Sequence, residues 1–478
     1  MPSIRPLLCF LWIWIGCLAP CSPLGPHAAA AQDASALNPP PPEWLCQWKA
    51  SLLSARAQLE QTRRTLQDLP LLQPNQPSPQ LGYLHPRTAT QPSSPPWIQV
   101  DLGDSFPLDA VVLLPAQTEW QAPEEPAHGF PNRLYIETSE DPEMRNATLL
   151  GQLENSQRPD PGIAPVRFPT RGIKGRFVRV TFAELARENG EFFCALSELI
   201  VLHGQRNVAA ARPVTASATT EIANRWSLSF LTDSKSPLGP PIALHPLPYD
   251  GIYFGKPSEQ EPAHAEIDLG QTLPIDEIRL HPIHAHIGST EPGWAFPKRF
   301  KVELSQDPSF QNPIEISPFT EVICPNPGNS PVVLRTPHLN ARHLRISLLE
   351  PYQGMESRFG LSEVEVFSGN KNVALGSKVT GSPDTLPASR NRPTNLLVDG
   401  FASSGKLLDL PQWLDACEKR RILDRSRDAL ARQIRSEEEA LGRQWHLART
   451  LLGSLLIATG LYQGFRLLRK TPAPKDRN

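Results

Sequence analysis

The chain has 478 residues with a formal net charge of −2, 20% charged and 40% hydrophobic residues, and 53 prolines. This charge balance excludes the general electrostatic attraction to nucleic acid that strongly basic proteins show. So many prolines argue against long helical domains and favour short strands joined by turns. The length suits two or three domains.

Residues 1–31 are typical of a secretory signal peptide. Arg5 supplies the positive charge, LLCFLWIWIGCLA at residues 7–19 the apolar core, and AAAAQ a small-residue cleavage site near Ala31. We therefore expect export, which places the mature chain where disulfides can form. An uncleaved anchor is the alternative.

Four cysteines follow the signal peptide: Cys46, Cys194, Cys324 and Cys417. They allow three pairings, and their spacing does not choose among them. The similarity of PEWLCQW (residues 42–48) and PQWLDAC (residues 411–417) makes Cys46–Cys417 the candidate disulfide. No C-x-x-C spacing occurs after the signal peptide, so a structural zinc site is not expected.

Helices are predicted at both ends of the mature chain. Apolar residues at alternating steps of three and four predict an amphipathic helix over 44–69, and a connector rich in proline follows over 70–96. Residues 411–446 predict a charged helix. It either remains a solvated stalk or pairs with the helix at 44–69.

Residues 447–468 predict a single transmembrane helix. The charge-free run Thr450–Phe465 covers roughly 24 Å, and the extension to 447–468 covers roughly 33 Å if Arg449 and Arg466 reach the two interfaces. The basic tail 469–478 then lies in the cytoplasm and the bulk of the chain outside it, in the periplasm or at the cell surface. A buried or interfacial helix is the alternative. Gly460 and Gly464 form a G-x-x-x-G pattern that predicts a homodimer.

Two copies of one pattern occupy 97–204 and 205–370. WIQVDLGDSFPLDAVVLLP (from Trp97) matches AEIDLGQTLPIDEIRLHP (from Ala265), and ALSELIVLHGQRNVA (from Ala195) matches GLSEVEVFSGNKNVA (from Gly360). Apolar and polar residues alternate within each block, which predicts half-buried antiparallel strands. We therefore expect a mainly β protein with two antiparallel β-sandwiches.

These motifs resemble the discoidin family, the coagulation-factor type C domains with the galactose-binding-like jelly-roll fold. The stretch NVAAARPVTAS…WSLSFLTD (residues 207–233) is similar to the family's first strand and loop, and residues 371–410 begin a third copy that packs on the second copy or completes a neighbour. The resemblance implies loops that bind glycans, lipid head groups or proteins, with a structural calcium in many members. The whole arrangement resembles the sensing half of bacterial envelope receptors.

No catalytic motif is present, so we do not expect an enzyme.

Aromatic and polar residues in the predicted loops suit sugar rings. In the second copy these candidates are Asn224, Arg225, Trp226, Tyr249, Asp250, Tyr253, His284, His286 and Trp294, and in the first copy Trp120 and His128. The alternative for Trp226 and Tyr253 is that they pack in the core. His284 and His286 could form a metal site, but the pattern favours histidines exposed in a loop.

The sequence thus predicts a membrane-anchored, extracytoplasmic protein that binds carbohydrate and acts in recognition, adhesion or sensing. Its short tail predicts a separate signalling partner. The alternatives are a structural or protein–protein interaction protein of the cell envelope and the binding subunit of a surface glycan-degrading system.

Overall fold

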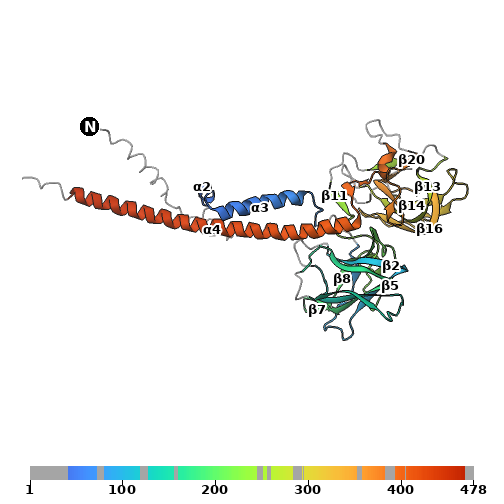
Figure 1. Cartoon of the computed structure of the whole chain (residues 1–478), viewed down its shortest axis with the longest axis horizontal. Coiled ribbons are helices and arrows are strands. Elements are labelled where there is room, and N and C mark those ends of the chain that lie inside the picture. The colour runs from blue at the N-terminus through green and yellow to red at the C-terminus, as the bar shows by residue number, and fades with distance from the viewer. Residues whose placement is uncertain are drawn as a thin grey trace, which may run out of the picture. The chain divides into compact units, whose positions relative to one another are not determined.

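The computed structural model describes residues 41–72, 80–118, 127–154, 160–244, 251–255, 260–283, 293, 295–352, 358–382, 393–403 and 405–468. The chain divides into two compact units, Leu59–Ala429 and the chain ends Met1–Gln58 with Leu430–Asn478. Figure 1 labels the helices and strands of the described residues. The predicted signal peptide and the basic tail lie outside the described residues.

The unit Leu59–Ala429 contains a first β-sandwich built from one bent sheet. Its strand order is β1 (Tyr83–Leu84), β8 (Ala195–His203), β2 (Trp97–Pro115), β5 (Val166–Glu184), β3 (Arg133–Ser139) and β4 (Thr148–Glu154), with β9 (Arg206–Asn207) beside β8. Register shifts interrupt the long β2–β5 pairing, and each of these two strands contributes on both sides of the interruption to one apolar core. A separate hairpin joins β6 (Ala186–Glu188) and β7 (Glu191–Phe193).

A second β-sandwich in the same unit repeats this design. Its strand order is β15 (Ile314–Glu315), β14 (Arg299–Ser305), β16 (Val332–Glu350), β13 (His264–His281), β18 (Glu363–Ser368) and β19 (Lys371–Asn372). Two small sheets complete it: β12 (Ile252–Phe254) with β17 (Phe359–Leu361), and β11 (Ile242–Leu244) with β22 (Gly405–Leu407) and β21 (Phe401–Ala402). The fold is therefore mainly β, as the alternating patterns predict.

Each sandwich is completed by the segment that follows it in the chain. Strand β10 (Val214–Ala216), expected to open the second copy, pairs with β2 of the first sandwich, Val214 opposite Val100. Strand β20 (Lys378–Gly381) of the supposed third copy pairs in the same way with β13, Val379 opposite Ile267. The second sandwich therefore begins after residue 233 rather than at 205, and the described residues 371–382, 393–403 and 405–407 belong to it.

Two short helices, η3 (Leu228–Leu231) and η6 (Thr394–Val398), also pack on the preceding sandwich. We call the two segments that complete the preceding sandwich, residues 207–233 and the described part of 371–407, the exchanged segments. Leu231 is part of the first core, and Leu397 and Val398 are part of the second. An ion-pair network connects the two sandwiches: Arg206 of β9 lies 3.4 Å from Asp276 and 3.6 Å from Glu277 of β13.

Three helices carry the predicted amphipathic and charged patterns: α2 (Glu43–Cys46), α3 (Ala50–Gln67) and α4 (Leu410–Leu468). A turn at residues 47–49 separates α2 from α3, so the helix expected over 44–69 is broken there. In the unit of the chain ends, Arg56 donates to Glu438 at 2.7 Å and the rings of Trp44 and Trp445 lie 5.5 Å apart. In the other unit, Arg420 donates to the carbonyl oxygens of Leu66 and Leu69. The pairing of the charged helix with the N-terminal helix is thus confirmed.

The candidate disulfide Cys46–Cys417 is not formed. Both cysteines, and Cys194 and Cys324, are free and buried. Cys417 packs among apolar side chains that include Trp413 and Leu414, and Cys194 and Cys324 lie in the two sandwich cores. Burial raises the pKa of the Cys417 and Cys324 thiols to about 12, so these groups stay protonated at neutral pH.

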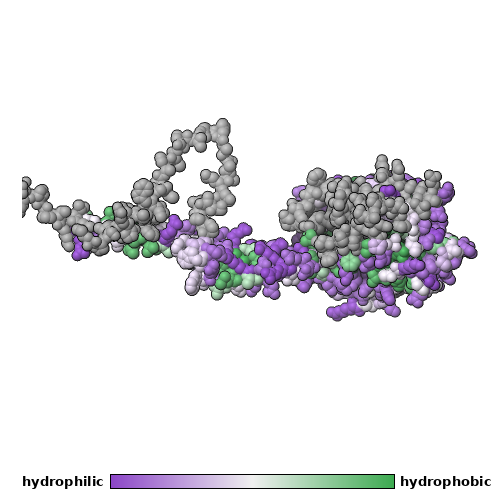
Figure 2. Space-filling view, turned by 90° about the horizontal axis from the view of Figure 1, so that it is seen from above, coloured by the Kyte–Doolittle hydropathy of each residue, from purple (hydrophilic) through white to green (hydrophobic). Residues whose placement is uncertain are grey.

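Within the described residues, no helix combines the length and the apolar character needed to cross a bilayer. This finding does not support the transmembrane helix predicted over 447–468. The segment is helical within α4, but Arg449 and Arg466 bound a charge-free stretch that is too short. Its large apolar side chains are exposed, and Figure 2 shows hydrophobic surface on the helical part of the molecule. The homodimer through Gly460 and Gly464 stays a prediction.

Both sandwiches hold an aspartate–arginine pair at equivalent places, and we predict that these pairs make stability depend on acid pH. Asp101 accepts from Arg176, and Asp268 accepts from Arg342, through two hydrogen bonds each. The hydrogen bonds from Arg342 lower the pKa of Asp268 to about 2. Because the pKa of Asp268 is lower in the folded state than in the unfolded state, the pair stabilises the fold at pH values above the unfolded pKa of about 3.9. This stabilisation is lost as the pH falls toward 2.

Asp268→Asn removes this titration. In urea unfolding between pH 5 and pH 2, the free energy of unfolding of the variant is expected to fall less steeply than that of the unmodified protein. Equal slopes would show that the Asp268–Arg342 pair does not contribute.

Candidate functional site

The structure relocates the predicted binding loop around Trp226. Asn224, Arg225 and Trp226 belong to the first sandwich, because the amide of Leu81 donates to the carbonyl of Arg225 at 2.7 Å and Gly82 bridges to Trp226. Trp226 is only 5% exposed and packs in an apolar cluster with Leu81, Leu84, Ala116, Phe193 and Ala195. The core reading of Trp226 is therefore correct, and its assignment to a ligand loop of the second copy is wrong.

His128 lies beside this tryptophan, although the sequence places the two residues in different copies. Its ring is 6.1 Å from the ring of Trp226 and 5.0 Å from that of Phe193, and its Nδ1 is 3.4 Å from a carboxylate oxygen of Glu188. Burial lowers the pKa of His128, and the nearby carboxylate only partly offsets this effect. His128 is therefore mainly neutral at pH 7.

The other predicted site residues divide into two groups. Tyr253 is half-buried on β12, opposite Gly360 of β17, so it also has a packing role. A side chain at position 360 would meet its ring at 3.1 Å. The remaining candidates lie outside the described residues: Trp120, Tyr249, Asp250, His284, His286 and Trp294.

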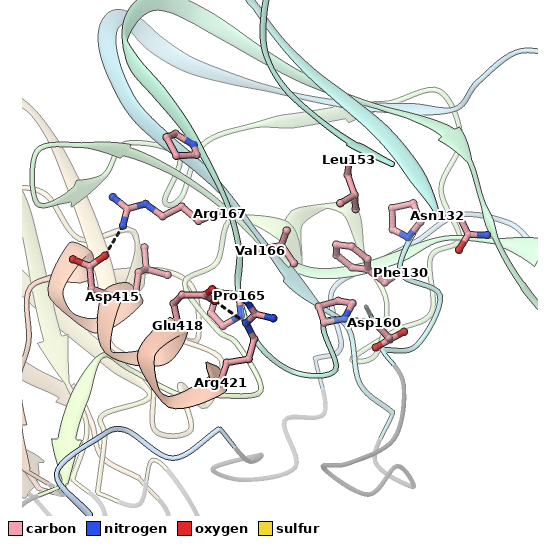
Figure 3. Close-up of a pocket in the computed structure, with 14 residues that line it drawn as sticks. Phe130, Asn132, Leu153, Asp160, Pro165, Val166, Arg167, Asp415, Glu418 and Arg421 are labelled. Carbon is pink, nitrogen blue, oxygen red and sulfur yellow. Dashed lines mark hydrogen bonds and ion pairs between the residues drawn. The ribbon is translucent and has the colours of Figure 1, made fainter. Parts of the chain in front are cut away.

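A cavity of about 370 Å³ lies next to the loop that carries His128 (Figure 3). One wall comes from the first sandwich, with Phe130 before β3, Leu153 at the end of β4 and Val166 at the start of β5. The other wall is the first part of α4. Four prolines also line it: Pro131, Pro161, Pro165 and Pro169. The volume lies within the range of small-molecule sites.

The apolar face of α4 packs on the first sandwich, and this packing directs the polar face of the helix toward the cavity. Asp409 accepts from the amide of Gln412 at the helix start, and Trp413, Leu414 and Cys417 are buried against residues of β2 and β8. These contacts turn the acidic residues of the same helix toward the start of β5. The charges of the predicted stalk thus line a cavity there.

Four of the five charged groups of the cavity form ion pairs with one another. Arg167 of β5 donates to Asp415 at 2.7 Å, and Arg421 donates to Glu418 at 2.7 Å along the helix (Figure 3). The hydrogen bond to Glu418 raises the pKa of Arg421. Asp160 accepts from the amides of Ala127 and Gly162. Such a wall offers donors and acceptors with little net charge, beside the apolar faces of Phe130 and the prolines.

Sequence reasoning missed this cavity. Phe130 lies in the stretch GFPNR (residues 129–133), where nothing local distinguishes it from a core residue. Asp415, Glu418 and Arg421 have the pattern of a solvated helix, and only the docking of Trp413 shows that they line a cavity.

The structure assigns no position to the calcium that the resemblance implies. Among the described residues, no three side chains of the metal-ligating types lie together. The buried carboxyl of Glu363 instead accepts from the amides of Asp399 and Gly400, and Glu198 accepts from Ser234 at the equivalent place. These bonds attach each following segment to its sandwich.

Comparison with known proteins identifies no family model and no curated relative that matches the chain. Solved structures match only distantly. The CBM32-1 and CBM32-2 domains of Clostridium perfringens ZmpB share 9% identity, with 59% of this chain and 84% of that chain covered and a TM-score of 0.20. A fucolectin from striped bass (Morone saxatilis) serum shares 12% identity, over 59% and 84% of the two chains, with a TM-score of 0.17. Saccharomyces cerevisiae allantoicase shares 11% identity, over 58% and 78%, with a TM-score of 0.19.

Proposed function

We propose that the protein is a non-catalytic carbohydrate-binding protein, and that it binds a neutral sugar in the cavity between the first sandwich and α4. The observation that carries this proposal is the composition of the cavity wall. Apolar faces can cover the C–H side of a sugar ring, while the paired groups of Arg167 with Asp415 and Arg421 with Glu418 can exchange hydrogen bonds with its hydroxyls.

A charged ligand fits this wall less well. An anion would have to compete with Asp415 for Arg167, and a cation with Arg421 for Glu418, so binding would break an existing ion pair. A neutral polyol can add hydrogen bonds at the free lone pairs and N–H groups without breaking either pair. Glycans are also among the ligands that the discoidin-type motifs of the sequence imply.

The test is a glycan array followed by calorimetric titration of the full chain. We expect saturable binding of at least one neutral sugar, and a loss of affinity of about tenfold or more in the double variant Asp415→Ala, Glu418→Ala, because hydrogen bonds to charged groups contribute about 1.5–3 kcal/mol each. Asp415 is 73% exposed, so the fold is expected to tolerate the change.

Asp428→Ala is the matched control, since Asp428 is an exposed carboxylate of α4 paired with Arg427 and does not line the cavity. It should bind as the unmodified protein does. An array without any neutral-sugar binding, or equal affinity of the double variant and the control, would remove the proposal.

A further inference from the structure

A second cavity adjoins the first one. It also has a volume of about 370 Å³ and is lined by residues 150–154 of β4 and residues 167–169 of β5. Leu153, Arg167 and Pro169 line both cavities. The two cavities therefore share these three lining residues, and we refer to the pair, which extends from α4 along β4, as the groove.

The position of β4 keeps this groove open at the side. Among the described residues, β4 is the last strand of its sheet and pairs only with β3. Along β4, Leu150 is buried while Gln152 and Glu154 are exposed. Gly151 allows β4 to pack closely against β5, because a Cβ atom at this position would lie 3.0 Å from the ring of Phe168. No strand of the described chain covers the outer edge of β4.

We propose that the groove takes a linear neutral oligosaccharide, with one part of the chain in the cavity beside α4 and the next part along β4. This inference rests on the proposed function and names the form of its ligand: an internal stretch of a sugar chain rather than a single terminal sugar. Each half of the groove matches the other in volume, and the β4 half adds one carboxylate, Glu154, beside Arg167. With Arg167 counted once, four carboxylates and two arginines line the whole groove, which disfavours a negatively charged sugar chain.

The lining also distinguishes a sugar chain from a peptide. A peptide that extends the sheet forms a row of backbone hydrogen bonds with one strand edge. Here the groove is lined from two strands, β4 and β5, and its occupant meets the side chains of Gln152, Glu154 and Arg167. Hydroxyl groups distributed around a sugar chain suit such a surface better than a single row of amides.

Chain-length dependence tests this inference. The full protein is titrated with β-1,4-linked gluco- and galacto-oligosaccharides of one, two, four and six units. Affinity is expected to rise at least tenfold between two and six units. Gln152→Trp fills the β4 half of the groove, so it should reduce the affinity for six units to that for two units and leave the latter unchanged. Ile314→Trp, on edge strand β15 of the second sandwich, is the matched control and should have no effect.

The outcomes separate the two proposals. Saturable sugar binding that does not depend on chain length, or that Gln152→Trp leaves intact, overturns the linear ligand while the carbohydrate site stands. If no sugar of any length binds, both proposals fail. Binding of extended peptides from a peptide array without any sugar binding would assign the groove to a peptide strand and also overturn the proposal.

Discussion

Replacing Glu277 by glutamine is expected to lower the free energy of unfolding by about 3–5 kcal/mol, the cost of removing one partner from a buried ion pair. The side chain has no exposed surface. Arg279 donates to it at 2.6 Å, Arg335 lies 3.0 Å away and Arg206, from the other sandwich, lies 3.6 Å away. Burial alone would raise the pKa of Glu277, but these three guanidinium groups outweigh it and hold the pKa below its ordinary value. Without the carboxylate, they would repel one another in a poorly solvated place.

Glu266→Gln is the control for this experiment. Glu266 lies on the same strand, β13, and accepts from one arginine, Arg345, at a partly exposed position. Its loss is expected to change stability by less than about 1 kcal/mol, as for other surface ion pairs. Urea unfolding of both variants at pH 7 makes the comparison. Similar small losses would show that Glu277 does not hold the two sandwiches together.

The repeat and its strands could be predicted from the sequence because alternation of apolar and polar residues is a local property. Val214 and Val379 illustrate the limit. Their motifs are correctly predicted as extended strands, but a strand pattern does not identify the strand that it pairs with. Val214 precedes the second copy, so chain order favours the following sandwich, whereas the structure pairs it with the preceding one. Val379 pairs with the second sandwich, which is one of the two placements expected for residues 371–410.

The candidate site depends even more on tertiary contacts. His128 and Trp226 meet only because of the exchanged segment, and the burial of Trp226 leaves it unsuited to stack on a sugar. The cavity beside α4 requires Trp413 to dock on the sheet, which the charged pattern of a predicted stalk helix does not indicate. Helix α4 forms through the segment predicted to cross a membrane, which shows that helix formation and the capacity to span a bilayer are separate properties.

The exchanged segments give a second prediction with a large expected effect. Leu231 and Leu397 are completely buried, in the first and second cores respectively. Truncation of a buried leucine to alanine costs about 2–5 kcal/mol, through lost apolar burial and the cavity that remains. Leu231→Ala should therefore destabilise the first sandwich, although the residue lies in the segment that resembles the opening of the second copy.

Amide hydrogen exchange can assign each loss to one sandwich, because the amides of Ile98–Val100 report on the first and those of Ala265–Asp268 on the second. Leu231→Ala should lower protection at the first set, and Leu397→Ala at the second set. Leu375→Ala, in the same segment as Leu397 but at an exposed position, should change neither by more than about 0.5 kcal/mol. If Leu231→Ala instead lowered protection only in Ala265–Asp268, the segment would belong to the sandwich that follows it, as chain order suggests.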